Sequence, residues 1–283
     1  MPVDPSQALG AKLPAGSTSY DKDRVILYHL GLGAGVPPTD ASELQYTYEK
    51  DLKVLPSFAV VAAFGAMGGL AEVPGLSFDW MMLLHGEQEV IIHRPLPPEA
   101  ELKTEAKIAE IWDKGKAALV VLESTSSDAD GPLFTNRFSL FLRGEGGFGG
   151  ESGPKAGNKP PERAPDGVVE VPTLPQQALI YRLSGDKNPL HADPEFAAMA
   201  GFDKPIIHGL CSYGVVCKAI VDNVLDGDTT KVASYAARFA GVGFPGETYV
   251  VSYWKEGDKV LIEAKSKERD AIIISNAAVT LNS

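Results

Sequence analysis

The chain has 283 residues, of which 44% are hydrophobic and 22% are charged. This is the balance of a globular protein and excludes a disordered chain. Lys and Arg number 26 against 37 Asp and Glu, so the formal net charge is −11. Bulk electrostatics therefore repel nucleic acid and anionic membrane surfaces, and we expect neither as a partner.

The N-terminal residues, Met-Pro-Val-Asp-Pro, have neither the basic nor the apolar segment of a signal peptide. The longest apolar stretch, Phe58 to Leu70, is too short and too rich in glycine to span a bilayer. Its composition predicts a buried helical segment. Cys211 and Cys217 are expected on different faces of one helix, so we expect no disulfide and a reducing compartment.

Strands are expected after this helical segment, over 101–112, 117–123 and 133–142, with a short Lys-Gly turn that favours a hairpin. A similar series recurs later in the chain, with an apolar helix over 208–225 and strands over 248–254, 260–264 and 271–281. Trp112 and Asn136 of the first series have counterparts in Trp254 and Asn276 of the second. A repeat of this length indicates a duplicated domain rather than a solenoid.

The fold class predicted by this pattern is α+β, with one buried helix and a set of antiparallel strands in each half. Between the halves, Gly144 to Pro165 is dominated by Gly and Pro and reads as a linker. We expect an N-terminal half over 1–150, a linker over 151–170 and a C-terminal half over 171–283.

The densest polar segment lies at the start of the second half. A short helix over 176–183 must end at Gly185, because Gly-Asp-Lys-Asn-Pro are turn formers. Asp193 and Pro194 then predict the start of another helix, which Gly201 ends. The loop between them holds Asp186, Asn188 and His191, either as caps and surface residues or as an acid–base group. An apolar helix beginning at His208-Gly209 follows, and its free N–H groups suit a developing oxyanion.

The segment Tyr-Arg-Leu-Ser-Gly-Asp-Lys-Asn-Pro-Leu-His, ending at His191, is followed by Ala-Gly-Phe-Asp-Lys-Pro-Ile-Ile-His-Gly-Leu, ending at Leu210. Together they resemble the hydratase 2 signature of the MaoC-like family. That family contains (R)-specific enoyl-CoA hydratases, including the hydratase part of peroxisomal multifunctional enzyme type 2. The resemblance extends over nearly the whole chain and implies a double hotdog fold. It also implies that water adds to trans-2-enoyl-CoA to give (3R)-3-hydroxyacyl-CoA in fatty acid β-oxidation.

The resemblance also implies roles for individual residues. Asp186 and His191 match the catalytic pair, Asn188 its supporting amide, and Gly209 the glycine whose N–H binds the thioester oxygen. Which of the pair is the formal acid stays open. The positions that match acyl-CoA contacts are His85, Gly86, Lys114, Lys187, Pro189, Leu190 and Phe239. The positions that match supporting residues are Tyr181, His208, Tyr28 and Glu49. The turn 241–245, Gly-Val-Gly-Phe-Pro, departs from the family's usual Lys-Pro-Val-x-Pro.

Several other classes of site are not supported. The five histidines and two cysteines show no metal-ligand spacing, and we expect no metal and no cofactor beyond the CoA thioester substrate. Gly144 opens a G-x-G-x-x-G match, but a Pro-rich linker follows it instead of the helix that a dinucleotide site requires. A hotdog acyl-CoA thioesterase and a non-catalytic acyl-CoA-binding protein remain as alternatives.

The substrate and the cellular setting are expectations from the resemblance. Glycines at 65, 68 and 69 interrupt the helical segment of the first half, which in the family leaves room for a medium to long acyl chain. The location is expected to be peroxisomal in a eukaryote and otherwise cytoplasmic, although the C-terminal Leu-Asn-Ser is not a peroxisomal address. Each chain contains both halves of the shared sheet, and a homodimer of such chains is allowed.

Overall fold

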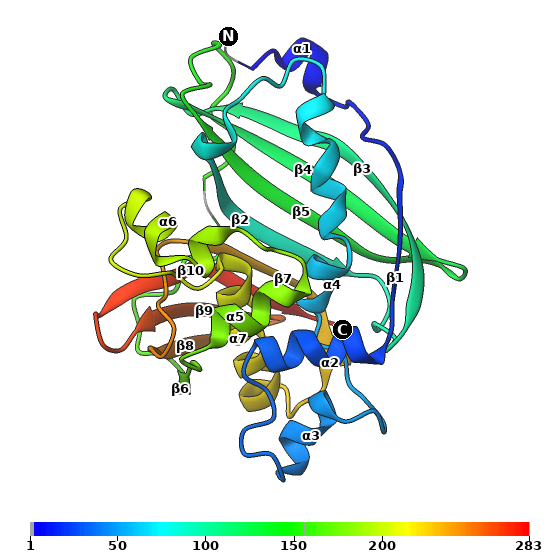
Figure 1. The fold of residues 1–283 in the computed structure, drawn as a ribbon, viewed down its shortest axis with the longest axis vertical. Coiled ribbons are helices and arrows are strands. Elements are labelled where there is room, and N and C mark those ends of the chain that lie inside the picture. The colour runs from blue at the N-terminus through cyan, green and yellow to red at the C-terminus, as the bar shows by residue number, and fades with distance from the viewer. Residues whose placement is uncertain (1–2, 156, 283) are drawn as a thin grey trace.

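A computed structural model of the chain describes residues 3–155 and 157–282. Over these residues ten strands form one antiparallel sheet, in the order β1-β3-β4-β5-β2-β7-β10-β9-β8-β6. The strands of the first half are β1 (Gly16–Tyr20), β2 (Leu83–Ile92), β3 (Ala100–Asp113), β4 (Ala117–Asp128) and β5 (Gly131–Arg143). Those of the second half are β6 (Gly167–Pro172), β7 (Val232–Phe239), β8 (Thr248–Glu256), β9 (Lys259–Ser266) and β10 (Ala271–Leu281). Each half therefore supplies one side of a continuous sheet (Figure 1).

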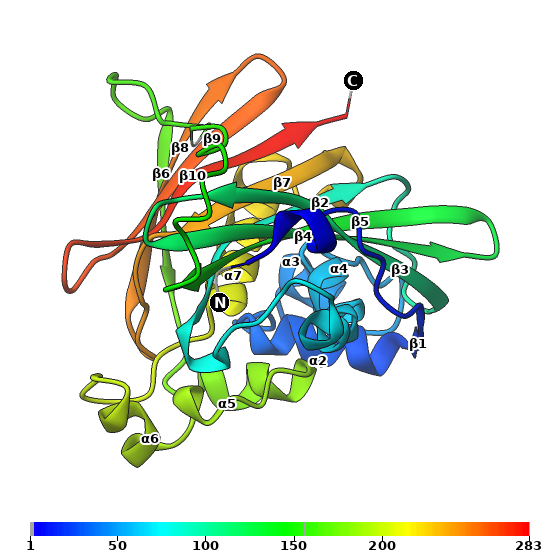
Figure 2. The ribbon, with the colours of Figure 1, turned by 90° about the horizontal axis from the view of Figure 1, so that it is seen from above.

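The two halves meet where β2 pairs with β7, with Glu87 opposite Arg238 and Val90 opposite Tyr235. The main helices lie together on one side of the curved sheet, as Figure 2 shows. The helices are α1 (Pro5–Ala8), α2 (Lys22–Gly31), α3 (Ala41–Thr47), α4 (Phe58–Ala62), α5 (Gln177–Tyr181), α6 (Pro194–Met199) and α7 (Gly209–Val224). Within the described ranges, no helix combines the length and hydrophobicity needed to cross a membrane.

The central helix of the second half, α7, is buried over most of its length, which confirms the helix expected over 208–225. Its Gly214 lies against α2: a Cβ there would be 2.6 Å from Leu32 Cδ2 and 2.7 Å from the Tyr28 hydroxyl. Only glycine therefore allows this close approach of the two segments. Cys211 and Cys217 are buried and free, as expected.

The corresponding segment of the first half is different. The α-helix α4 covers five residues, all of them buried, and a 3-10 segment over Phe64–Glu72 continues it. Gly65, Gly68 and Gly69 fall in this second part, where their backbone freedom and missing side chains disfavour an α-helix. The helix expected within 58–70 is thus α-helical only in its first part. Asn136 Nδ2 donates to Ala59 O at 3.0 Å and ties α4 to the sheet.

The expected strands are present, and most are longer at their ends than predicted. Over 144–166 the described residues form neither helix nor strand, in agreement with the Gly- and Pro-rich composition. Strand β6 begins at Gly167, however, so the last four residues assigned to the linker pair with β8. Alternating exposure and the terminal Pro172 are typical of such an edge strand. The division of the chain into 1–150, 151–170 and 171–283 otherwise remains a prediction.

Candidate active site

A cavity of about 490 Å³ lies where β2 and β7 meet the N-terminus of α7. Both halves contribute to it. Its lining includes Phe64, Met67, Leu83, Leu84 and His85 from the first half, and Asp186, Asn188, Leu190, His191, Ile206, Gly209 and Phe239 from the second. Of the apolar members, Leu190 and Phe239 were expected from the family resemblance. The others were not predicted, because nothing in an apolar residue type distinguishes a cavity wall from the core.

In the loop that carries the polar residues, side chains cap short turns of the backbone. Gly185 has φ of +136°, which side chains rarely adopt, and it ends the short helical segment before it. Asp186 Oδ1 accepts from Asn188 N at 3.0 Å, and Asn188 Oδ1 accepts from Leu190 N at 3.0 Å. Asp186 and Asn188 therefore cap turns and also line the cavity, so the capping role does not exclude the acid–base role, which remains a prediction.

His191 is held with a basic nitrogen available. Its Nδ1 lies 2.9 Å from the carbonyl oxygen of Ile206, which can only accept, so Nδ1 carries the proton and Nε2 the lone pair. Burial lowers the pKa of His191, against the opposing effects of the Ile206 carbonyl and the Asp186 charge. The ring is therefore neutral at pH 7 and can accept a proton.

His208 contacts both members of the predicted pair. Its ring stacks on that of His191, with centroids 3.7 Å apart. Its Nε2 lies 3.1 Å from the backbone oxygen of Asp186 and donates to it. Burial, followed by the charge of a protonated His191, lowers the pKa of His208 to about 4. Its Nδ1 is buried and has no hydrogen-bond partner among the described residues.

Gly209 begins the sixteen-residue helix α7 and lines the cavity, and its amide has no acceptor in the described part of the chain. A Cβ at this position would lie 3.3 Å from the Phe239 ring, so a side chain would crowd the site. Free N–H groups and the positive end of the helix dipole both favour a negatively charged oxygen here.

Asp186, His191 and His208 also bring possible metal-ligand atoms within 4.8 Å of one another. Metal spacing in the sequence did not predict this group, because the loop and the start of α7 are brought together only by folding. A carboxylate with two imidazoles can bind transition metals. The two rings, however, are stacked at 27°, which sets their in-plane lone pairs side by side instead of converging on one point. The arrangement fits acid–base chemistry better than a metal centre.

The first half contributes His85 to the same cavity. His85 Nε2 donates to Glu87 O at 3.1 Å, and burial lowers the pKa of His85 to about 4. Its ring packs edge-on against Phe239 with centroids 5.0 Å apart. Gly86 lies at a β-bulge, and a Cβ there would be 2.5 Å from the Phe141 ring. Gly86 therefore shapes the strand beside His85.

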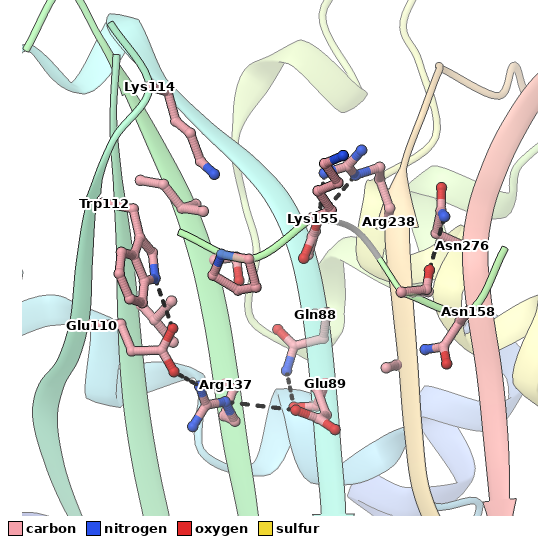
Figure 3. Close-up of a pocket in the computed structure, with 18 residues that line it drawn as sticks. Gln88, Glu89, Glu110, Trp112, Lys114, Arg137, Lys155, Asn158, Arg238 and Asn276 are labelled. Carbon is pink, nitrogen blue, oxygen red and sulfur yellow. Dashed lines mark hydrogen bonds and ion pairs between the residues drawn. The ribbon is translucent and has the colours of Figure 1, made fainter. Parts of the chain in front are cut away.

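Lys114 lies elsewhere. It lines a separate cavity of about 320 Å³ between the sheet and the linker, shown in Figure 3 with Lys155, Arg137 and Arg238. Its Nζ donates to the carbonyl of Ser152. Arg137 and Arg238 are paired with glutamates, whereas neither lysine pairs with a carboxylate within the described ranges. Two cations are thus available in this cavity.

The remaining predicted residues fall into two groups. Tyr181 and Tyr28 are buried behind the site, with the Tyr181 ring centroid 5.0 Å from that of His208. They support the site by packing. Lys187 and Pro189 lie in the catalytic loop but outside the cavity lining, and Glu49 is exposed and lines neither cavity described here.

An antiparallel sheet shared by two repeated halves defines a double hotdog protein, and the loop opposite the α7 N-terminus gives it an acid–base site. Residues 18–144 match the MFE-2 hydratase 2 N-terminal domain and residues 156–277 the MaoC like domain. The chain belongs to the MaoC-like hydratase 2 family.

Relatives cover the chain nearly end to end. Enoyl-CoA hydratase ChsH3 of Mycobacterium tuberculosis is 48% identical over 279 residues, which are 97% of this chain and 98% of that protein. Peroxisomal multifunctional enzyme type 2 of Mus musculus is 43% identical over 97% of this chain, but the match spans only 38% of the mouse protein. A MaoC-like dehydratase from Phytophthora capsici superposes with a TM-score of 0.89 at 34% identity, covering 99% of both chains.

Proposed function

We propose that this protein is an (R)-specific enoyl-CoA hydratase, which adds water reversibly to trans-2-enoyl-CoA in fatty acid β-oxidation. The observation that carries the proposal is the placement of His191 and Asp186 in one cavity with the free amide of Gly209. Relatives named as enoyl-CoA hydratases that match over nearly their whole length support the same reaction.

In the proposed reaction, Gly209 N–H, which has no acceptor among the described residues, donates to the thioester oxygen. Asp186 and His191 Nε2 hold one water molecule. His191 takes a proton from the water as its oxygen bonds to C3, and the double-bond electrons move toward the thioester. A proton from the pair then bonds to C2 on the same face, which balances the addition. The amide donor stabilises the enolate-like oxygen, an effect typically worth about 3–4 kcal/mol.

Hydration changes no oxidation state of the system as a whole and transfers no group other than water. Acid–base groups and an oxyanion donor are therefore sufficient, and we propose that no cofactor acts beside the CoA thioester. The CoA phosphates would interact with Lys114, whose cavity also contains the unpaired Lys155. Local cations are needed because the whole chain is strongly acidic.

The acyl chain would extend toward the first half. Phe64 lines the catalytic cavity and also a further cavity of about 620 Å³, which borders the catalytic loop at Ser184 and Gly185. This arrangement favours medium to long acyl chains. A peroxisomal location in a eukaryote, a cytoplasmic location otherwise, and a homodimer are the accompanying proposals.

Absorbance and thiol assays on a C4 and a C10 trans-2-enoyl-CoA test the proposal. Loss of the enoyl band without release of free CoA is expected from hydration. Release of thiol would indicate the thioesterase alternative. An unchanged enoyl band with either substrate, in a protein that still binds acyl-CoA, would indicate a non-catalytic binding protein.

A further inference from the structure

The backbone around Asp186 is held from two sides. His208 Nε2 donates to the carbonyl of Asp186 at 3.1 Å, and Arg182 Nη2 donates to the next carbonyl, that of Lys187, at 3.0 Å. Gly185 precedes this segment with a φ that only glycine adopts readily, so the chain has unusual freedom there. The two donors come from different elements and remove that freedom.

Arg182 is half-buried, and its Nη2 makes the contact with the Lys187 carbonyl near the surface. Its Nε is buried and has no hydrogen-bond partner among the described residues. Within the described residues no carboxylate forms an ion pair with Arg182, whereas Arg137 and Arg238 are each paired with glutamate. An ion pair therefore does not account for the position of the Arg182 guanidinium.

We propose that Arg182 is a positioning residue for the hydration reaction, holding the Asp186–Lys187 backbone so that the Asp186 carboxylate stays opposite His191. The proposal rests on the proposed function. Arg182 does not line the catalytic cavity, so it acts through the loop and not on the substrate. A displacement of about 1 Å at reacting groups can cost about 10²-fold in rate, which makes such a fixed loop consequential.

The positive charge of Arg182 also affects the two histidines, because it favours their neutral forms. Burial is the main cause of the lowered pKa of His191, the Ile206 carbonyl and Asp186 oppose it, and the Arg182 cation adds to the lowering. For His208, burial and His191 come first, and Arg182 again adds to the lowering. The same guanidinium that holds the loop therefore also favours neutral imidazoles.

The test compares Arg182→Lys, which keeps a donor and a charge, with Arg182→Met, which keeps only the apolar stem. We expect Arg182→Met to lower kcat about 10–100-fold and to leave KM for the enoyl-CoA within about twofold. Arg182→Lys should retain at least about fivefold more kcat than Arg182→Met, because it can still donate to the Lys187 carbonyl. If Arg182→Met is unfolded by circular dichroism, Arg182→Gln replaces it.

A double-mutant cycle separates positioning from a general structural role. In the Asp186→Asn background, Arg182→Met should lower the remaining rate by less than about twofold, because the carboxylate that it positions is already lost. Arg94 provides a control, since its guanidinium also donates to backbone carbonyls, at Pro132 and Gly131, in a distant hairpin, where it is in addition paired with Asp128. Arg94→Met should leave kcat unchanged.

Equal kcat values for Arg182→Lys and Arg182→Met, or equal losses in the wild-type and Asp186→Asn backgrounds, would overturn the positioning role. A rise in KM with unchanged kcat would do the same, because it would indicate substrate binding. The proposed function fails separately, if Asp186→Asn and His191→Gln both keep wild-type turnover.

Discussion

The two halves of the molecule share one strand-and-helix plan but use it differently. In the second half, sixteen residues of α7 fill the sheet, and the helix N-terminus faces the catalytic loop. In the first half the corresponding helix, α4, has five residues, and the 3-10 segment after it borders a cavity of about 620 Å³. The two copies of the scaffold thus differ in the length of their central helix and in the cavities beside it, and the proposed function assigns the chemistry to the second copy and the space for the acyl chain to the first.

The paired asparagines show the same divergence. Asn136 of β5 is buried and its side chain donates to Ala59 O in α4. Asn276, at the corresponding place in β10, donates to Gly157 O in the linker. One copy of the residue therefore fixes a helix, and the other fixes the connection between the halves.

Loss of acid–base groups is expected to give the largest effect. Asp186→Asn or His191→Gln should lower turnover about 10²–10⁴-fold while the fold is kept, because each removes one of the two proton-transfer groups of the proposed reaction. His85→Gln, in the first half, should act mainly on KM. Steady-state kinetics on variants checked by circular dichroism decide this. A fall in kcat for His85→Gln as large as that for His191→Gln would show that both halves supply chemistry.

The packing around the two helical segments can be compared by making the same glycine-to-valine change in each. Gly214→Val should destabilise the protein by about 1–3 kcal/mol, because the side chain would overlap Leu32 and Tyr28. Gly65→Val should change stability by less than about 0.5 kcal/mol, since a Cβ there meets nothing within 4 Å. Urea unfolding measures both. Equal destabilisation would mean that the first-half segment is as tightly packed as α7.

Substrate binding by the first half is tested at Lys114. Lys114→Glu should raise KM for acyl-CoA about 3–10-fold with a smaller change in kcat, because it replaces a cation with an anion at the expected phosphate contact. Lys103→Glu is the matched control on an exposed strand position, where Lys103 pairs only with Glu105. Low-salt initial-rate kinetics give both constants. A fall in kcat of the same size with KM unchanged would instead mean that Lys114 stabilises the transition state.

The pH dependence gives the smallest expected effect. Because burial lowers the pKa of His191, its ring stays neutral to a lower pH than a free imidazole, whose pKa is about 6.5. The acid limb of kcat/KM should therefore have its midpoint below pH 6.5.

The stability of the fold should also decrease as the pH is lowered. A lowered pKa in the folded state means that protons favour unfolding, so His85 and His208 stabilise the fold fully above about pH 6.5 and lose this contribution toward pH 4. Thermal unfolding should show a Tm that falls as the pH is lowered from 7 to 5.

For the kinetic prediction, an acid limb of kcat/KM with its midpoint above pH 6.5 would contradict the buried, neutral His191.

Much of this architecture was predictable because its signals are local. Apolar periodicity and turn residues predicted the long hairpin strands and α7, and the polar loop predicted the place of Asp186 and His191. Strands β1, β2, β6 and β7 were missed, since their register depends on partners distant in sequence. The stacking of His208 on His191 likewise depends on how the loop meets α7. Lys114 was expected near the acyl-CoA from resemblance, but the sequence could not show that it lines a different cavity from His191.

The stereochemistry of the product tests the central claim most directly. Asp186 and His191 belong to one short loop, so both parts of one water molecule should add to the same face of the alkene, which the Gly209 amide selects. With a trans-2-enoyl-CoA as substrate, an (R)-specific 3-hydroxyacyl-CoA dehydrogenase should then generate NADH, whereas an (S)-specific dehydrogenase should generate none. Dominant NADH production by the (S)-specific enzyme would contradict the account, even if hydration itself were observed.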